Sequence, residues 1–534
     1  MSIADWTWRR REMRIAAGAL ALCGLIATPV SAKAPTILRA RLNADILSSD
    51  PGTRRDENTD AVLLHVVEGL VAFRKDGTVG PLLAKGWTVS GGGRTYTFAL
   101  RQGVYFQNGV PLTSADVVWS FNRYLDPATH WRCRYEFQDG GIAKIVSITA
   151  PDDSTVVIVL DRPAPLFLTT LSRADCGGTG ILQRASVAPD DSWRKPVGTG
   201  PFMFGTWKHN QYVELKRFAR YQPLPGPRDG NTGGKHALVD TIRFLVIPDD
   251  SAALAALLRG NIDILDGLSP DQLRTARGAG DIRIVLTPTL DFYALLFQTS
   301  DPVMKDPLLR RAVALSIDTA ALANAVTWGT GLADNSPIPK ASPFHGPAEA
   351  LLRKQNIALA KDLVRQSHYR GERIVLIANR RYPQMFDAAV LIQAMAREAG
   401  IDMQIQTLDW ATQVSLYLKG AYQAMMFGFS AKLDPSLSFD LLIGDKKRDP
   451  RKVWDAPEAQ SLLRNSVETA DPGGRQAAFD ALNAQFLKDV PAIVLFNTSR
   501  VTAIRSNVKG YEGWSAAQQR FWDVSKSCTK EMPC

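Results

Sequence analysis

The segment 373–429 reads RIVLIANRRYPQMFDAAVLIQAMAREAGIDMQIQTLDWATQVSLYLKGAYQAMMFGF and alternates short apolar runs with longer amphipathic ones. Its periodicity predicts three strands and two helices, in the order strand 373–378, helix 383–399, strand 401–408, helix 413–419 and strand 424–429. Strand–helix–strand units connect parallel strands and place helices on the faces of a sheet. The segment therefore predicts an α/β fold with mostly parallel sheets.

Shorter elements on the N-terminal side extend this pattern. The residues 89–106 predict a hairpin with three glycines at its turn, and 145–160 predict a second hairpin. The sequence TSAD at 113–116 is typical of a helix start, and Asp126 before a proline is typical of a helix end. Three further elements are predicted, a strand at 242–247, a helix at 251–259 and a short strand at 262–264.

The composition is that of an ordinary folded protein. The 534 residues are 45% hydrophobic and 22% charged, which is ample for a packed core. At roughly 150 residues per domain, this length suggests about three domains. The 63 Lys and Arg residues exceed the 53 Asp and Glu residues by ten, but the two signs are interleaved along the chain. Such a mildly basic surface is not typical of a nucleic-acid-binding protein.

The first 32 residues have the anatomy of a secretory signal peptide. Four arginines lie within 9–14, an apolar run follows at 15–27, and small residues at 30–32 predict cleavage after Ala32. The apolar run is too short to span a bilayer core of about 30 Å. A large residue precedes Cys23, which argues against a lipoprotein. We therefore expect an exported, soluble, periplasmic protein, by either the Sec or the twin-arginine route.

Cysteine usage agrees with an oxidising compartment. The predicted mature chain has four cysteines, Cys133, Cys176, Cys528 and Cys534, which allow three pairings. Proximity in sequence favours Cys133–Cys176 and Cys528–Cys534 as disulfides. Zinc is disfavoured because there is no C-x-x-C motif and the six histidines are scattered. We expect no metal site.

Catalytic signatures are missing from the sequence. There is no G-x-S-x-G elbow, no P-loop, no H-E-x-x-H motif and no G-x-G-x-x-G sequence after a strand. The paired carboxylates at 152–153 and 249–250 lie in predicted turns, where catalysis is improbable. We therefore expect no enzymatic activity, no catalytic residue and no cofactor.

Seven motifs, in one order along most of the chain, resemble the extracellular solute-binding proteins of family 5. These are the oligopeptide-, dipeptide- and nickel-binding receptors of ABC importers. The motifs are LAKGWTVS (83–90), YTFALRQGVYF (96–106), NGVPLTSADVV (108–118), GTGPF (198–202), ALLRGNID (256–263), DPLLRRAVALSID (306–318) and VPAIVL (490–495).

The resemblance implies a type II periplasmic-binding-protein fold of the large cluster, with two α/β lobes of mixed sheets and flanking helices. The implied bounds are 33–57, 191–287 and 496–534 for a discontinuous lobe I, 58–190 for an additional domain inserted in lobe I, and 288–495 for lobe II. The hinge would consist of two crossings, near 287–289 and near 496–498.

The resemblance also implies a ligand-binding strand end at Phe429 and Ser430. In the peptide receptors of this family, an acidic residue just beyond this strand pairs with the ligand's ammonium, and the strand pairs with the peptide backbone. The matching position here is Lys432, which would repel an ammonium and attract a carboxylate or phosphate. Either Asp434 has taken over the acidic role, or the ligand is not held by a free N-terminus.

Further ligand-binding positions follow from the same resemblance. Trp410 matches a tryptophan that lines the pocket, and Trp131 and Tyr135 occupy the region that supplies a tyrosine to the cleft. Glu68 matches an acidic residue that forms an ion pair between the lobes. A predicted strand end carries Arg380, Arg381 and Tyr382 as further candidates. The two arginines can bind a ligand carboxylate bidentately.

We therefore expect a monomeric periplasmic receptor that captures a short peptide or peptide-like solute and delivers it to the membrane permease of an ABC importer. Nucleic acid is not an expected partner. One alternative is the same kind of receptor for a non-peptide anion, such as an opine, a glutathione-like conjugate or a sugar phosphate. A secreted peptide hydrolase is a second alternative.

Overall fold

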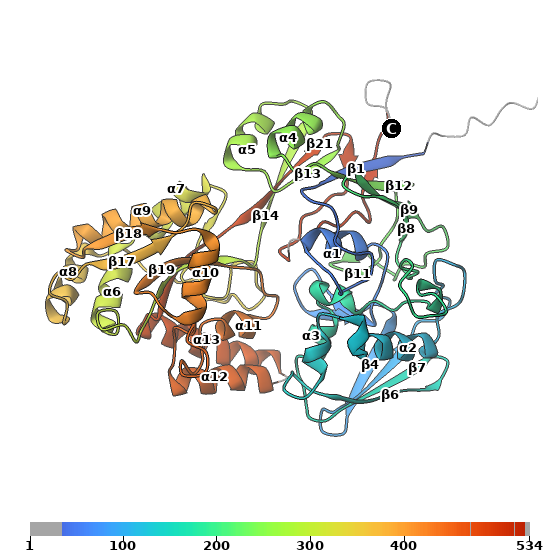
Figure 1. The fold of residues 1–534 in the computed structure, drawn as a ribbon, viewed down its shortest axis with the longest axis horizontal. Helices are drawn as coiled ribbons and strands as arrows, with labels where there is room; N and C mark the ends of the chain where they lie inside the picture. Colours follow the sequence, from blue (N-terminus) through green and yellow to red (C-terminus); the bar gives the residue numbers. More distant parts are fainter. Residues whose placement is uncertain (1–34, 470, 517, 529–534) are drawn as a thin grey trace, which may run out of the picture. The chain divides into compact units, whose positions relative to one another are not determined.

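The computed structural model describes residues 35–469, 471–516 and 518–528 (Figure 1). The predicted signal peptide, 1–32, lies outside the described residues. Within the described ranges, no helix is long and apolar enough to cross a lipid bilayer.

The larger of the two main sheets has seven strands drawn from distant parts of the chain. Their spatial order is β14 (Ile282–Pro288), β21 (Ser499–Arg505), β13 (Ile264–Asp266), β1 (Ile37–Leu42), β12 (Thr241–Val246), β9 (Tyr212–Arg217) and β8 (Phe202–Lys208). β1 pairs in parallel with β12 and β13, and the other neighbours are antiparallel. The sheet is therefore mixed.

The second main sheet has six strands. Their order is β16 (Leu332–Ala333), β20 (Ala492–Asn497), β15 (Phe292–Phe297), β19 (Ala424–Phe429), β17 (Ile374–Ala378) and β18 (Met403–Thr407). β17 is parallel to β18 and β19, whereas β15 is antiparallel to β19 and β20. Met426 and Met425 of β19 lie in two different hydrophobic clusters, so the sheet is covered on both faces. A strand buried on both faces reads as a continuous apolar run, as β19 does.

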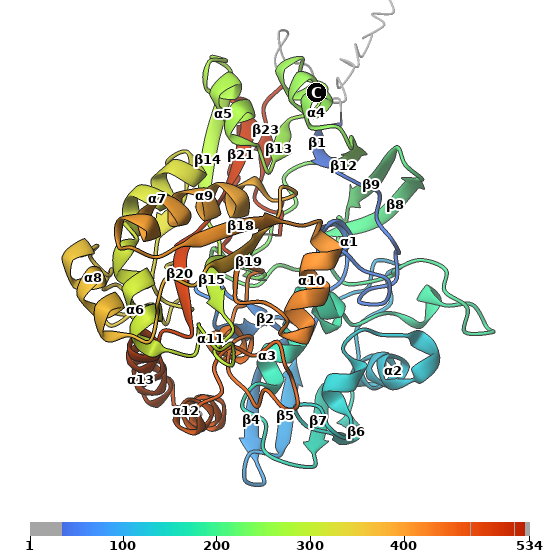
Figure 2. The same ribbon diagram turned by 60° about the vertical axis from the view of Figure 1, so that its left-hand side comes forward.

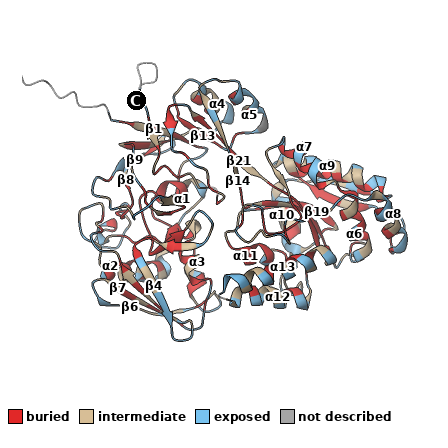
Figure 3. Cartoon of the chain, turned by 180° about the vertical axis from the view of Figure 1, so that it is seen from behind, coloured by how far each residue is buried: buried red, intermediate tan, exposed pale blue. Residues whose placement is uncertain are grey.

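Helices cover both faces of this second sheet. α7 and α9 pack on one face and α13 packs on the other, with α12 beside it (Figure 2). Exposed residues follow the outer sides of α7, α8 and α9 (Figure 3). The helices are α1 (Glu57–Leu63), α2 (Ser114–Leu125), α3 (Phe167–Leu171), α4 (Asp250–Leu258), α5 (Pro270–Arg277), α6 (Pro307–Ser316), α7 (Thr319–Thr327), α8 (Ile357–Gln366), α9 (Pro383–Glu398), α10 (Trp410–Lys419), α11 (Pro435–Asp440), α12 (Pro457–Glu468) and α13 (Pro472–Asp489).

A four-stranded antiparallel sheet contains the two hairpins predicted between residues 89 and 160. Its order is β4 (Ala84–Ser90), β5 (Thr95–Leu100), β7 (Thr155–Leu160) and β6 (Ile145–Asp152). Alternate residues of β5 are buried, which matches the period of two in its sequence. The smaller pairs are β2 (Val71–Phe73) with β3 (Val79–Pro81), β10 (Arg228–Asp229) with β11 (Thr232–Gly233), and β22 (Val508–Lys509) with β23 (Ser525–Lys526).

The structure confirms the α/β class but corrects three details. The prediction of mostly parallel sheets is wrong, because hairpins and strands from distant segments add antiparallel neighbours to both main sheets. The helix predicted from 413 begins at Trp410, since the Asp409 carboxylate accepts a hydrogen bond from the Thr412 amide at 3.0 Å and caps it. The short strand predicted at 262–264 lies at Ile264–Asp266. The bounds given above for the lobes and the additional domain stay predictions.

Candidate ligand-binding site

Two adjacent connections join the seven-stranded sheet to the six-stranded sheet. The chain passes from β14 to β15 through 289–291, and from β20 to β21 at Thr498. The Thr289 amide donates to the Thr498 carbonyl at 3.0 Å, and the Thr498 hydroxyl donates to the Asp291 carboxylate at 2.7 Å. These bonds fasten the two connections to each other at the positions expected for a hinge.

A cavity of about 1220 Å³ lies beside these connections. Its lining includes Thr289 and Thr498, the ends of both main sheets, and the segments that surround the Cys133–Cys176 disulfide. Six basic side chains line it: Arg41, Arg55, Arg132, Arg173, Lys432 and Arg500. The volume exceeds the roughly 300–1,000 Å³ of ordinary small-molecule pockets, so it can hold a short peptide together with water.

The five arginines in this lining are all paired with carboxylates. The pairs are Arg41 with Asp250 at 2.6 Å, Arg55 with Asp60, Arg132 with Asp175 at 3.3 Å, Arg173 with Glu136 at 2.6 Å and Asp175 at 2.8 Å, and Arg500 with Asp266 at 2.7 Å and Glu57. Burial raises the pKa of the Asp60 carboxyl to about 7, although Arg55 donates a hydrogen bond to it. These ion pairs neutralise most of the positive charge of the residues that line the cavity.

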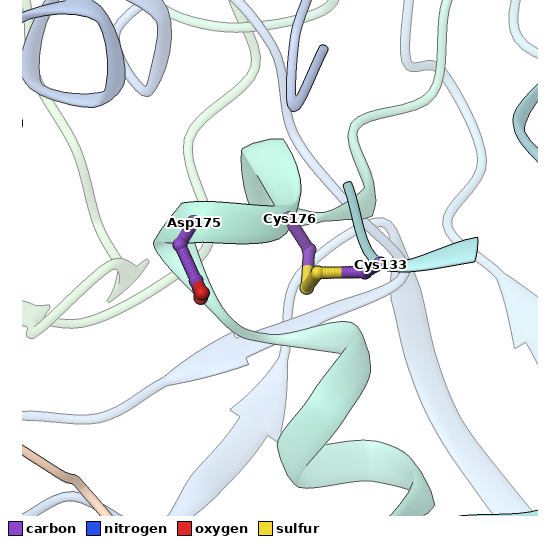
Figure 4. Close-up of side chains that lie close together, drawn as sticks. All are labelled: Cys133, Asp175 and Cys176. Atoms are coloured by element: carbon purple, nitrogen blue, oxygen red, sulfur yellow. A yellow bond between two sulfur atoms is a disulfide. The ribbon is translucent and has the colours of Figure 1, made fainter. Parts of the chain in front are cut away.

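One ion-pair cluster lies directly beside the disulfide. Figure 4 shows the Asp175 carboxylate next to the bond between Cys133 and Cys176. Burial opposes ionisation of Asp175, but hydrogen bonding and charge from Arg173 lower the pKa of this carboxyl to about 2. Asp175 is therefore a carboxylate at neutral pH, and its charge is shared by two arginines.

The sulfur and oxygen atoms of this group lie within 4.8 Å of one another. They do not make a metal site, because sulfurs joined in a disulfide are not thiolate ligands. The predicted Cys133–Cys176 disulfide is confirmed. Cys534 lies outside the described residues, so its pairing with Cys528 stays a prediction.

The loop after β19 supplies three predicted residues to the cavity, Ser430, Lys432 and Asp434. The Asp434 carboxylate caps α11 by accepting a hydrogen bond from the Ser436 amide at 3.0 Å, and it pairs with Arg475 at 2.8 Å. The ammonium group of Lys432 has no hydrogen bond or ion pair with any residue in the described part of the chain. Burial lowers the pKa of Lys432.

Aromatic residues approach the cavity from two parts of the chain. Tyr135 and Tyr382, both predicted, line it. Tyr382 packs edge-on against Trp410, with ring centroids 5.0 Å apart. Trp410, Arg380 and Arg381 instead line a second cavity of about 530 Å³, where β17 and β18 end. The guanidinium of Arg380 lies 3.7 Å from the centroid of the Phe386 ring, and neither arginine has an ion pair within the described ranges.

Two predicted aromatic residues belong to the hydrophobic core and do not line either cavity. Trp131 is 3% exposed, stacks on Phe137 at 5.7 Å and donates its indole hydrogen to the Cys176 carbonyl at 3.0 Å. Phe429 is 5% exposed and packs on Phe292 at 4.9 Å. Both side chains point into packed layers, so their apolar surface is buried without a ligand.

Glu68, the residue expected to form an ion pair between the lobes, has three partners in the structure. The Glu68 carboxylate accepts from Lys235 at 2.5 Å, from Tyr221 at 2.9 Å and from Thr199 at 3.1 Å. None of these partners lies within 288–495, and the Glu68 and Lys235 side chains are 1% and 2% exposed. Glu68 is therefore buried among these partners and does not line either cavity.

The charged cluster of Arg132, Glu136, Arg173 and Asp175 was not predicted from the sequence. A signal was present, because Arg132 precedes Cys133 and Asp175 precedes Cys176. A disulfide between those cysteines necessarily brings their charged neighbours together. The contact of Asp291 with Thr498 carried no comparable signal, since 207 positions separate the two residues.

Comparisons with known proteins agree with this architecture. The family model described as bacterial extracellular solute-binding proteins, family 5 Middle, matches residues 78–448. The probable D,D-dipeptide-binding periplasmic protein DdpA of Escherichia coli (strain K12) is 26% identical over 488 residues, which cover 88% of this chain and 90% of that protein.

Two solved structures share the fold. HbpA2 from Haemophilus parasuis superposes with a TM-score of 0.79 at 22% identity, over 92% of this chain and 100% of that one. The periplasmic binding protein DppA from Helicobacter pylori, in complex with the peptide STSA, superposes with a TM-score of 0.70 at 24% identity, over 92% of this chain and 98% of that one. The predicted two-lobed periplasmic-binding-protein fold is confirmed. With a family match that extends over more than half of its length, the chain belongs to the bacterial extracellular solute-binding proteins of family 5.

Proposed function

We propose that this protein is the periplasmic receptor of an ABC importer, and that it captures a short peptide or peptide-like solute and delivers it to the membrane permease. The signal peptide predicted at 1–32 would export it. The observation that carries the proposal is the cavity of about 1220 Å³ that the ends of both main sheets line beside the two chain crossings.

A solute in this cavity can touch groups attached to both sheets. Ser430 follows β19 of the six-stranded sheet, whereas Asp266 ends β13 of the seven-stranded sheet. A ligand that contacts both parts favours the closed arrangement by its difference in affinity for the closed and open states. Rotation about two adjacent connections is a hinge motion. The permease would then recognise the closed form.

Two observations favour a peptide-like solute. Tyr135 and Tyr382 supply aromatic walls. A D,D-dipeptide is named for the relative DdpA, and a peptide occupies the related DppA structure.

A non-peptide anion is the second candidate, favoured by Lys432, which lines the cavity and has no ion pair among the described residues. The hydrolase alternative has less support, since the family and the relatives named above are binding proteins. In this proposal the cavity traps the solute and leaves it unchanged.

Native mass spectrometry of protein purified without denaturation tests the proposal. We expect a co-purified solute of the mass of a di- to pentapeptide, which leaves on unfolding. Ser430→Trp would place an indole in the cavity and abolish the bound mass, whereas Ser192→Trp, on an exposed turn, would keep it. A wild-type protein with no bound solute and no binding to a peptide library would refute the receptor role, as would cleavage products accumulating from an incubated peptide.

A further inference from the structure

Lys432 differs from the other basic residues of the large cavity. Each of the five arginines in the lining has a carboxylate partner, but the Lys432 ammonium has no partner in the described part of the chain. The side chain is partly buried, and burial lowers the pKa of its ammonium. A cation that has lost water without gaining a partner is destabilised, and a bound anion removes that penalty.

The carboxylates nearest to Lys432 in sequence are already engaged. Asp434 pairs with Arg475 at 2.8 Å and caps α11. Asp440, at the end of α11, is 61% exposed and lies 3.6 Å from Lys452. Neither carboxylate forms an ion pair with the Lys432 ammonium, and Lys432 lines the cavity.

The cluster beside the disulfide lines the same cavity as Lys432. Burial lowers the pKa of Lys432, Asp175 raises it, and Arg173 and Arg132 lower it further. The Asp175 charge is already shared by two arginines. Arg132 uses only Nε to reach Asp175, so its two Nη groups have no hydrogen-bond partner among the described residues. Both Lys432 and Arg132 therefore line the cavity with donors that no described residue uses.

We propose that the ammonium of Lys432 and the guanidinium of Arg132 bind one anionic group of the solute, a carboxylate or a phosphate, in the large cavity. This inference rests on the proposed receptor function and narrows its substrate class. An anion placed there makes charge-assisted hydrogen bonds to both side chains. It would therefore add affinity and favour closure at once. A solute that presents an ammonium at the same place would meet two like charges and would bind less well.

The first test observes the Lys432 ammonium directly. Reductive methylation with 13C-formaldehyde labels every lysine for NMR, and Lys432→Arg identifies the Lys432 signal by removing it. Sodium acetate and sodium phosphate are then titrated at constant ionic strength. We expect a saturable shift of the Lys432 signal, at least about fivefold larger than the shift of the exposed Lys447. A response to acetate assigns a carboxylate, and a response to phosphate assigns a phosphate. If Lys432 moves no more than Lys447 with either anion, the inference is wrong.

The second test measures affinity with defined peptides. Calorimetry compares trialanine with trialanine amide on the wild type, on Lys432→Gln and on the control Lys447→Gln. Loss of one charge-assisted hydrogen bond corresponds to about a 10- to 100-fold rise in Kd. We expect that rise for trialanine in Lys432→Gln but not in Lys447→Gln, and a smaller rise in Arg132→Gln. Equal binding of both peptides to all variants would overturn the anion site but would not contradict the receptor function. If neither peptide binds to any variant, the peptide proposal is contradicted, and the NMR titration alone decides whether Lys432 binds an anion.

Discussion

The buried ion pair of Glu68 and Lys235 gives the sharpest stability prediction. The two side chains are 1% and 2% exposed, their charged atoms lie 2.5 Å apart, and Lys235 also lies 5.1 Å from the centroid of the Trp522 ring. Lys235→Met would fill the volume but leave the Glu68 carboxylate buried with only two hydroxyl donors. Removing one partner of a buried pair costs about 3–5 kcal/mol of unfolding free energy.

A double-mutant cycle measures this interaction. Lys235→Met, Glu68→Gln and the double variant are unfolded in urea and followed by tryptophan fluorescence. We expect each single variant to lose about 3–5 kcal/mol, and the double variant to lose about 1–3 kcal/mol less than the sum. The matched control is Lys144→Met, which breaks an exposed pair with Asp139 whose side chains are 48% and 83% exposed. That control should lose about 1 kcal/mol or less.

Two results would contradict this reasoning. A loss below about 1 kcal/mol in Lys235→Met would show that the carboxylate is solvated, contrary to its exposure of 1%. Strict additivity in the double variant would show that the two groups do not interact. Either outcome would also reopen the possibility that Glu68 faces a ligand.

Three further predictions concern other parts of the chain. Replacing Cys133 and Cys176 by Ala opens a loop with a sequence separation of 43. Urea unfolding should then give an unfolding free energy that is lower by about 4 kcal/mol. A loss below about 1 kcal/mol would contradict the cross-link. Burial lowers the pKa of His65 to about 4, and Nε2 of its neutral ring accepts a hydrogen bond from the Phe521 amide. About 3 kcal/mol of stability present above pH 6.5 should therefore be lost as the pH falls toward 4. His65→Gln should flatten that pH dependence. Trp328 is the C-cap of α7, with φ of 55°, and its side chain is 62% exposed. Trp328→Gly should raise the unfolding free energy by about 1 kcal/mol and so raise the urea midpoint. A lowered midpoint would show that the side chain contributes more to stability than the backbone strain costs.

Patterns within short segments predicted much of the fold. The sequence predicts a strand at 424–429, and β19 lies at Ala424–Phe429. Six apolar residues in a row are buried on both faces only between two packed layers. α2 begins where the capping sequence places it, since Thr113 and Asp116 satisfy each other's donors locally. Mixed strand directions were not predictable in this way, because β21 enters the seven-stranded sheet from the far end of the chain.

The sequence alone predicted the family and the alternation of strands and helices, which depend on motifs in a fixed order or on residues close in the chain. It favoured the pairing of Cys133 with Cys176 among three possibilities, and the structure confirmed that pairing. Only the tertiary structure decided which charges remain unpaired. Asp434 is neutralised by Arg475 and Glu68 by Lys235, while Lys432 has no such partner in the described residues. The physical reason is that a charge is compensated by whatever side chain the fold brings within a few ångströms, and those partners lie 41 and 167 positions away in sequence.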